Sequence, residues 1–336
     1  MRRVLIVHRA GPGVTIQDGG RPGFLAFGLS RGGATDRLAL AEGAALLGQS
    51  DDLAVLEMPG MGGRFEVTQD TRFALTGGEM RATLDGAPLV WNASHLLPAG
   101  AVLDIGPVTS GAYGYLHLGG GIGTEPAMGA RATHLTAGLG RVIEAGQRLP
   151  LGVDKGSRAG MLLPRDDRFR GGTLRVVESL QTGFFPADDL KRFTTTTFTR
   201  DTRANRMGVR MPSDGPGFHV EGGLNVVSEI IVPGDIQVTG DGTPFVLLSE
   251  CQTTGGYPRI ATVLPADLPR VAQAPPGAKL GFRFVPLAEA VEAEAKFRKH
   301  CKDLPRSLQP LVRDPHDISD LLSYQLISGV TAGDDL

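Results

Sequence analysis

Short apolar or alternating runs, each ended by Gly, Pro or Asp, dominate the hydrophobic pattern of this chain. Runs of this kind are typical of β-strands joined by tight turns. Their spacing favours a mainly β fold, as a barrel or a sandwich, over alternating strand–helix units. The predicted strands lie at residues 4–7, 65–67, 73–75, 102–105, 113–118, 174–177, 230–232, 236–238, 245–248 and 280–285.

Helical periodicity is rare, and the pattern predicts only a few short helices. The best candidate covers residues 35–47, where Thr35 can cap the first turn, Asp36 suits the positive N-terminus, and Gly48 follows as a stop. Weaker patterns predict a helical turn at 266–272, a charged surface helix at 287–302 and a helical stretch at 318–326.

A polar, glycine-rich segment at residues 164–172 reads Pro-Arg-Asp-Asp-Arg-Phe-Arg-Gly-Gly. Because 336 residues exceed the usual size of one domain, we place a domain boundary in this segment. We expect an N-terminal β unit at 1–165, a second β unit at 166–290 and a helical C-terminal tail at 291–336.

The composition excludes several classes of function. A net charge of −2 and a pI of about 6.4 create no field that favours nucleic acid or an anionic membrane. The first apolar stretch is too short for a signal peptide, and no apolar run reaches the length of a transmembrane helix. Cys251 and Cys301 form no paired motif. We therefore expect a cytoplasmic protein without structural disulfides.

Most standard catalytic signatures are missing. The segment Gly-Val-Asp-Lys-Gly-Ser at 152–157 fails the spacing of a phosphate-binding loop, and the seven histidines show no metal-binding pattern. We predict no metal site. Cys251 follows a predicted strand and could be a nucleophile, but a small buried hydrophobic role is the more common one for such a cysteine.

Two short groups of residues remain as candidates for binding. Asp18, Arg21 and Asp36 form an acid–base–acid group, which either fixes a turn by a salt bridge or has a functional role. Residues 252–258, Gln-Thr-Thr-Gly-Gly-Tyr-Pro, follow an apolar run and offer hydroxyls and flexible backbone. They predict either a rim that binds a small anion or amide, or a hairpin turn that satisfies its own backbone.

Several separated motifs together resemble one family. The stretch at 13–23, Gly-Val-Thr-Ile-Gln-Asp-Gly-Gly-Arg-Pro-Gly, precedes Gly28, Ser30, Gly32, Gly33, Ala34, Asp36 and Ala39. The second half adds Asn-Arg-Met-Gly at 205–208, Pro-Gly-Asp-Ile-Gln-Val at 233–238, residues 252–258 and Ala-Asp-Leu-Pro at 266–269. In this order they resemble a bacterial family that includes the C subunit of 5-oxoprolinase and is also called allophanate hydrolase subunit 2 or biotin-dependent carboxyltransferase-like. Glu250 and Val209 depart from it, because the family usually has Asp and an aromatic residue there.

This resemblance implies two cyclophilin-like β-barrel units and a role in a complex of several subunits. For a 5-oxoprolinase, it implies ATP-dependent opening of 5-oxoproline to glutamate, with a homologue of the B subunit in direct contact and a homologue of the A subunit needed functionally. One alternative is the carboxyltransferase component of a biotin-dependent urea or amide carboxylase, with biotin supplied by another protein. Another is a regulatory module that binds a small partner, as the antagonist of a sporulation-kinase inhibitor does.

The chemistry shared by the two enzyme alternatives suggests roles for the matched residues. Activation of an amide creates charged oxygens that need fixed donors. Arg21 and Arg206 are the expected anion clamps, while Asp18, Asp36 or Glu250 would orient an N–H group or act as base. We expect Asp18, Arg21, Arg206 and Glu250 to be catalytic, and residues 252–258 to line one pocket with residues 205–207. The expected substrate-binding residues are Asp36, Asn205, Gln237, Thr253, Thr254, Gly255, Gly256 and Tyr257.

Overall fold

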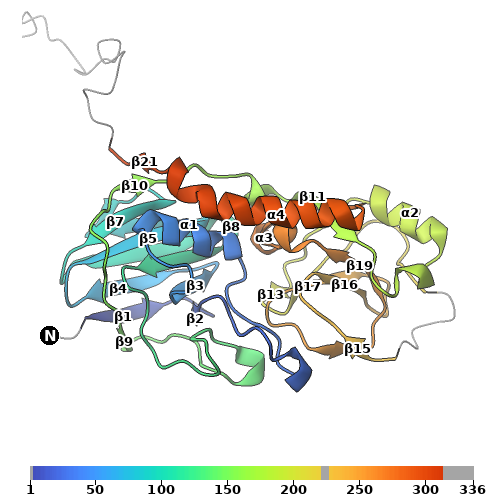
Figure 1. Cartoon of the computed structure of the whole chain (residues 1–336), viewed down its shortest axis with the longest axis horizontal. Helices are drawn as coiled ribbons and strands as arrows, with labels where there is room; N and C mark the ends of the chain where they lie inside the picture. Colours follow the sequence, from blue (N-terminus) through green and yellow to red (C-terminus); the bar gives the residue numbers. More distant parts are fainter. Residues whose placement is uncertain (1–2, 221–226, 313–336) are drawn as a thin grey trace, which may run out of the picture.

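Two curled β-sheets lie side by side in the computed structural model, which describes residues 3–220 and 227–312 (Figure 1). Within these residues the first sheet has eleven strands, with the order β21-β10-β7-β5-β8-β4-β1-β9 and β2, β3 and β6 paired outside this path. Its strands are β1 Val4–Ala10, β2 Thr15–Gln17, β3 Val55–Pro59, β4 Gly63–Val67, β5 Thr71–Leu84, β6 Ala87–Pro88, β7 Ala93–Leu97, β8 Val102–Leu118, β9 Arg148–Pro150, β10 Met161–Leu162 and β21 Gln309–Pro310.

The second sheet is built from the later part of the chain. Among the described residues it has eight strands, in the order β12-β20-β11-β19-β16-β17-β14-β13, and a separate two-stranded ribbon pairs β15 with β18. All its pairings are antiparallel except that of β11 with β20. Its strands are β11 Gly172–Val177, β12 Phe198–Thr199, β13 Ala204–Asn205, β14 Gly208–Arg210, β16 Asp235–Val238, β17 Pro244–Leu247, β19 Arg259–Val263 and β20 Lys279–Phe284; the ribbon is β15 Glu229–Ile230 and β18 Thr254–Gly255.

Helices are few and short, as predicted, and the mainly β fold is confirmed. The α-helices of the described residues are α1 Arg37–Leu47, α2 Ala187–Thr195, α3 Leu268–Gln273 and α4 Leu287–Asp303, and the 3₁₀ turns are η1 Leu25–Phe27, η2 Leu135–Ala137, η3 Arg168–Arg170, η4 Thr182–Phe184, η5 Pro265–Asp267 and η6 Leu304–Ser307. The described part of the chain contains no helix long and apolar enough to cross a membrane.

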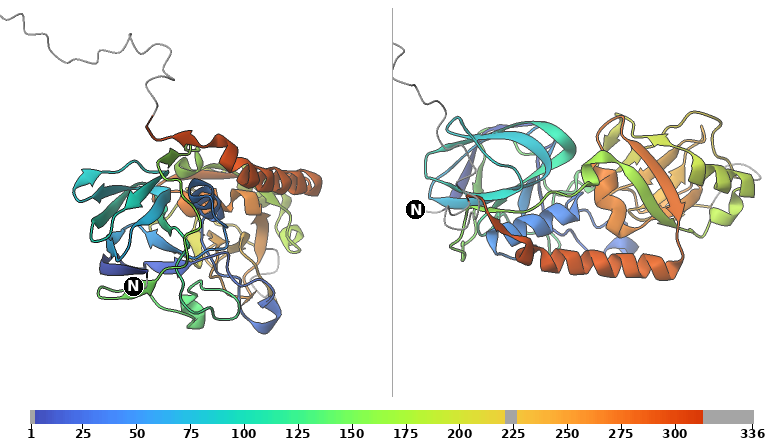
Figure 2. Two further views of the ribbon diagram at one scale, coloured as in Figure 1. Left: turned by 60° about the vertical axis from the view of Figure 1, so that its left-hand side comes forward. Right: turned by 90° about the horizontal axis from the view of Figure 1, so that it is seen from above.

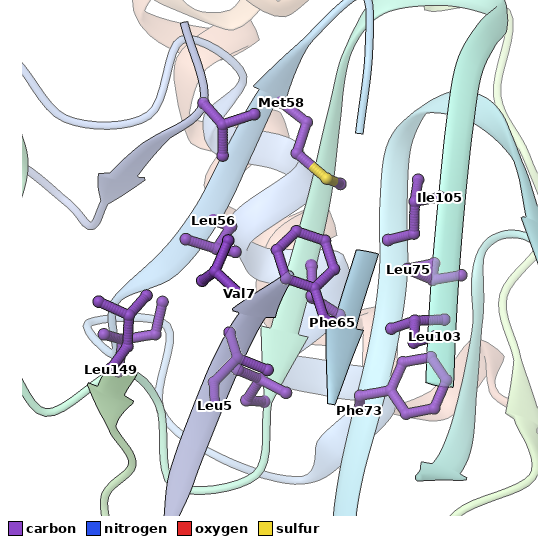
Figure 3. Packing of buried hydrophobic residues seen from close by; sticks show 14 of the residues in the cluster. Leu5, Val7, Leu56, Met58, Phe65, Phe73, Leu75, Leu103, Ile105 and Leu149 are labelled. Atoms are coloured by element: carbon purple, nitrogen blue, oxygen red, sulfur yellow. The ribbon is translucent and has the colours of Figure 1, made fainter. Parts of the chain in front are cut away.

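Each sheet has its own hydrophobic core. In the first, alternate side chains of β1 such as Leu5 and Val7 point inward and are fully buried, as a strand with one covered face requires. They pack against residues of β3, β4, β5, β8 and β9 (Figure 3). In the second, the rings of Phe193 and Phe282 stack with centroids 4.6 Å apart, and Phe218 meets Phe193 edge-on at 5.7 Å. Phe193 comes from α2, a helix that the sequence pattern did not predict.

Helix α1 begins two residues later than predicted, because its cap is Asp36. The Asp36 carboxylate accepts hydrogen bonds from the backbone N–H groups of Leu38 and Ala39, at 3.0 and 3.1 Å. The expectation that Thr35 caps the helix is wrong, since the Thr35 hydroxyl instead accepts from Arg206 at 2.9 Å. The predicted stop is correct: Gly48 closes the helix at a φ of 60°, a left-handed conformation that suits glycine.

Helix α4 lies along both sheets and returns the chain to the first sheet (Figure 2). Arg37 of α1 forms a bidentate ion pair with Glu294 of α4, with N–O distances of 3.1 and 2.6 Å. After α4, strand β21 pairs with β10 of the first sheet. Apart from β21, the strands of the first sheet come before residues 164–172, and the strands of the second sheet come after β10. The limits of the predicted units remain a proposal. The stretch at 318–326 lies outside the described residues.

Candidate functional site

A cavity of about 270 Å³ opens between the two sheets. Its walls carry residues from segments that are far apart in the sequence, because the loop before α1 faces the ends of β17 and β19. Four of the motifs contribute lining residues, namely those at 13–23, 28–39, 233–238 and 266–269. The lining includes Asp18, Gly32, Thr35, Pro233, Leu268 and Pro269. We call this cavity the interface cleft.

Arg206 joins the two halves of the molecule behind the cleft. The residue is 8% exposed. Nε donates to Glu250 at 2.6 Å, Nη2 donates to the Gly33 carbonyl at 2.7 Å, and Nη1 donates both to Thr35 and to Glu57. Burial alone would lower the pKa of Arg206, but the two carboxylates outweigh it and hold the guanidinium charged. The predicted anion clamp therefore already has several acceptors from this chain.

Glu57 anchors the same network from β3. It is fully buried and accepts from the Thr35 backbone N–H and from the Tyr115 hydroxyl, each at 2.7 Å. The Tyr115 oxygen in turn accepts from the Asp36 backbone N–H at 2.8 Å. Burial, and then the Glu57 charge, raise the pKa of Tyr115 well above its ordinary value, so Tyr115 stays a neutral donor. These bonds fix the loop before α1 that forms one wall of the cleft.

A second buried ion cluster lies at the start of α1. Asp36 Oδ2 accepts from Arg168 Nε at 2.9 Å and from Gln273 at 2.8 Å. Arg168 also forms a bidentate pair with Glu42, at 2.9 and 2.7 Å. Burial raises the pKa of Glu42 to about 7, and Arg168 opposes this shift only in part. Asp36, predicted to bind substrate, is fully buried and has its oxygens engaged within the chain.

Asp18 and Arg21 organise a loop of the first sheet. Asp18 accepts from the backbone N–H groups of Gly20 and Arg131 at 2.8 and 2.6 Å. Arg21 is 2% exposed and donates to three backbone carbonyls, those of Ala127, Ala130 and Ala132. Asp18 lines the interface cleft, while Arg21 lines a different cavity. The structure therefore does not bring Arg21 and Arg206 to one cavity.

Glu250 faces the first half of the molecule. Besides Arg206, it accepts from the Leu135 backbone N–H at 3.0 Å. The adjacent His134 has Nε2 2.8 Å from Ser30 Oγ, and its Nδ1 accepts from the Ala137 backbone N–H at 3.3 Å. Because Nδ1 is an acceptor, Nε2 of the neutral ring carries the hydrogen and donates it to Ser30. This tautomer cannot take a proton from the serine, so the pair does not activate a nucleophile.

Residues 252–258 follow Ser249, the last residue before them that lines the cleft. Thr254 and Gly255 form β18 and pair with β15, and Tyr257 is 48% exposed. Gly255 lies against Gln237, since a Cβ at this glycine would be 2.4 Å from Gln237 Nε2. Within the described residues that buried Nε2 has no hydrogen-bond partner. Thr253, Gly256 and the exposed Asn205 are not among the residues that line the interface cleft. A pocket shared by 252–258 and 205–207 remains a prediction.

Cys251 is buried, and burial, followed by the Asp235 charge, raises its pKa to about 12. A thiol with this pKa is protonated at neutral pH and is a poor nucleophile. The structure therefore supports the packing role for this cysteine. In the described segments, no group of three or more His, Cys, Asp or Glu side chains is placed to hold a metal ion.

Four residues of the site were not predicted from the sequence: Glu57, Tyr115, Arg168 and Arg31. Glu57 interrupts the apolar run of β3, and a carboxylate at such a position is buried and must be paired. That signal could have been noticed from the sequence. Arg31 lines the cleft and donates Nε to the Gly19 carbonyl at 2.8 Å, while its Nη groups have no partner among the residues described. Nothing local distinguishes Arg31 or Arg168 from other arginines.

Comparison with known proteins places these motifs in context. Residues 27–284 match the family model described as "Carboxyltransferase domain, subdomain A and B". The chain is 33% identical to the C subunit of 5-oxoprolinase from Escherichia coli over 307 residues, which cover 90% of this chain and 97% of that relative. It is also 33% identical to the protein of the same name from Haemophilus influenzae over 289 residues, which cover 84% and 91%.

A solved structure has the same fold. The urea carboxylase of Kluyveromyces lactis superposes with a TM-score of 0.81 at 21% identity, over 94% of this chain and 31% of that chain. The present chain thus spans less than a third of that chain, and the likeness extends to both sheets.

Proposed function

This chain belongs to the family of the carboxyltransferase domain, subdomains A and B, and on that premise we propose that it is the C subunit of a 5-oxoprolinase. The observation that carries the proposal is the 33% identity to two proteins of that name along nearly their whole length. The cleft that collects the family motifs at the junction of the two sheets supports it.

The proposed reaction opens the lactam of 5-oxoproline to give glutamate, with one water added across the C–N bond and ATP hydrolysis as the driving force. The chain would act with a homologue of the B subunit in direct contact and a homologue of the A subunit that completes the reaction. We place this complex in the cytoplasm, and the two unpaired cysteines, Cys251 and Cys301, suit a reducing compartment.

We propose that the substrate lies in the interface cleft. Arg31 offers unpaired guanidinium donors there, and Ser249 offers a hydroxyl. The Thr35 hydroxyl already donates to Glu57 and accepts from Arg206, so Thr35 would shape the wall. In this arrangement Arg206, Glu57 and Glu250 would hold the cleft wall in place, so that donors need no reorganisation when charge develops on the activated amide. Asp18 and Arg21 would act in the same way through the loop they fix.

Reconstitution tests the proposal. The purified chain alone should turn over almost no 5-oxoproline, while its mixture with homologues of the A and B subunits should form glutamate and ADP in equal amounts. The homologue of the B subunit should co-purify with the chain. Turnover by the isolated chain with ATP would contradict the shared-enzyme proposal, and so would a complete mixture that forms but does not consume 5-oxoproline.

An arginine variant tests the position of the site. Arg31→Gln should lower turnover of the reconstituted complex about thirtyfold or more, because a charge-assisted contact to a developing anion contributes roughly 2–4 kcal/mol. Its melting temperature should stay close to that of the unmodified chain. Arg81→Gln is the matched control, since Arg81 is exposed in β5 and does not line the interface cleft. Equal turnover of the two variants would move the site elsewhere.

The description of the family model names a carboxyltransferase, and this favours one second candidate. We propose for it the transfer of a carboxyl group from biotin to urea or another amide. In this case the biotin would come from another protein. A mixture of the chain with a biotin carboxylase and a biotinylated carrier would then consume bicarbonate and ATP in the presence of urea. Activity in this assay, without 5-oxoproline turnover, would replace the first proposal by the second.

A further inference from the structure

A second cavity, of about 410 Å³, lies in the first sheet unit next to β9. It shares no lining residue with the interface cleft. Four arginines line it, Arg21, Arg131, Arg141 and Arg148, together with a single carboxylate, Glu125. We call it the arginine cavity. Its volume falls in the usual range for sites that bind small molecules.

Arg21 contributes the most unusual feature of this cavity. Its side chain is almost fully buried, and its Nε and Nη2 are bonded to backbone carbonyls. Nη1 is also buried, yet it finds no hydrogen-bond partner in residues 3–220 and 227–312. An unpaired buried guanidinium nitrogen is costly, so native proteins rarely keep one without an ion or water beside it.

The other three arginines also keep donors available. Arg131 uses Nε to bond the Thr124 carbonyl at 2.7 Å, and no described residue accepts from its Nη groups. The exposed side chains of Arg141 and Arg148 have no hydrogen-bond or ion-pair partner in the described part of the chain. Four guanidinium groups and the Glu125 carboxylate line the cavity, and the Asp18 carboxylate lies close behind, bonded to the Arg131 N–H. The wall therefore keeps an excess of about two positive charges, which only an anion with more than one charge would neutralise.

We propose that the arginine cavity binds a small phosphorylated metabolite through its phosphate group. Guanidinium groups bind phosphate bidentately, and a phosphate monoester carries nearly two negative charges at neutral pH. A monocarboxylate would leave part of the excess charge of the wall uncompensated. Arg21, with its buried and unpaired Nη1, would add a fixed positive charge to the wall. This inference does not depend on the reaction proposed for the interface cleft.

Calorimetric titration of the full chain with glycerol 3-phosphate tests the proposal, with 5-oxoproline as the monocarboxylate and constant ionic strength. Glycerol 3-phosphate should bind and should raise the melting temperature, and 5-oxoproline should not displace it. The double variant Arg141→Gln/Arg148→Gln should weaken this binding about tenfold or more, because two charge-assisted bonds are lost. Arg81→Gln should leave it unchanged. Arg21 is not varied, because it holds the loop at 127–132.

Three results would overturn the proposal. The first is the absence of any binding of glycerol 3-phosphate to the folded chain at millimolar concentration. The second is equal affinity of the double variant and the Arg81→Gln control. The third is displacement of glycerol 3-phosphate by 5-oxoproline, which would assign the cavity to a carboxylate instead.

Discussion

Arg206 and Glu57 form an ion pair across the junction of the two sheets, between the turn that joins β13 to β14 and the middle of β3. Both residues are buried, at 8% and 0% exposure. Glu250 completes the group on the other side of the guanidinium. A charge enclosed in this way is stable only while its partners remain, so the junction depends on all three residues together.

Arg206→Ala should therefore destabilise the fold. Removal of the guanidinium leaves two buried carboxylates without a counter-ion, a loss typically of about 3–5 kcal/mol in the free energy of unfolding. Chemical denaturation measures it. Arg203→Ala is the matched control, because the Arg203 side chain is 72% exposed and pairs only at the surface. If Arg206→Ala kept its stability but lost turnover in the reconstituted complex, Arg206 would be the ligand clamp that the sequence suggests.

Gly43→Ala should also destabilise the fold, although Ala is the better helix former. Gly43 lies in α1 where a Cβ would be 2.2 Å from the ring of His117. Overpacking of this kind costs about 1–3 kcal/mol, more than the gain of about 1 kcal/mol in helix propensity. A thermal melt of the variant decides between the two effects. Gly281→Ala, which meets nothing within 4 Å, should melt close to the unmodified chain.

His117 should make the protein sensitive to acid. Burial lowers the pKa of His117 from 6.5 to about 3, so the unfolded chain takes up a proton at a pH where the folded chain does not. The contribution of neutral His117 to the free energy of unfolding is complete above pH 6.5. It is lost as the pH falls towards 3, by about 1.4 kcal/mol per pH unit. His117→Gln keeps a donor for Thr76, which bonds Nε2 at 2.8 Å. Unfolding curves of this variant at pH 7 and pH 5 should differ less than those of the unmodified chain; an equal difference would contradict the assignment.

Glu42 should act in the opposite direction. Its pKa in the folded state is raised to about 7 from an ordinary value of 4.5, chiefly by burial. The folded chain therefore holds this proton more tightly, and the stability from Glu42 is complete below pH 4.5 and is lost as the pH rises to about 7. Glu42→Gln, which keeps an acceptor for Arg168, should gain stability relative to the unmodified chain between pH 5 and pH 8. If the free energies of unfolding of the variant and the unmodified chain differed by the same amount at every pH in this range, Arg168 would keep Glu42 ionised throughout.

The apolar runs of the sequence indicated the strands because each sheet has one covered face. Residues 4–7, Val-Leu-Ile-Val, are a continuous apolar run that forms part of β1, and their burial alternates along the strand. Helix α2 was missed because it is short and polar, and only Phe193 is buried. Its stability depends on the aromatic cluster of the second sheet, which no local pattern reveals.

The motifs indicated the cleft, but not the partners of its residues. Thr35 was expected to cap a helix and Arg206 to hold a ligand, since local sequence shows only what a side chain can donate. In the structure both meet Glu57, which stands 149 residues before Arg206 in the chain. Long-range pairs of buried charges arise from topology, so the residue patterns could suggest the site without its internal ion pairs.

The pairing of β21 with β10 has a consequence for synthesis of the chain on the ribosome. Strand β10 ends at residue 162, whereas its partner begins at residue 309, after the whole second sheet and α4. The first sheet can therefore assemble early but leaves β10 uncovered until residues 309–310 have been made. Open edges invite pairing with other chains. The nascent protein thus exposes β10 to misassembly for as long as the second sheet takes to emerge. Strand β21 then covers β10 and becomes the edge itself, with only two residues, one of them a proline.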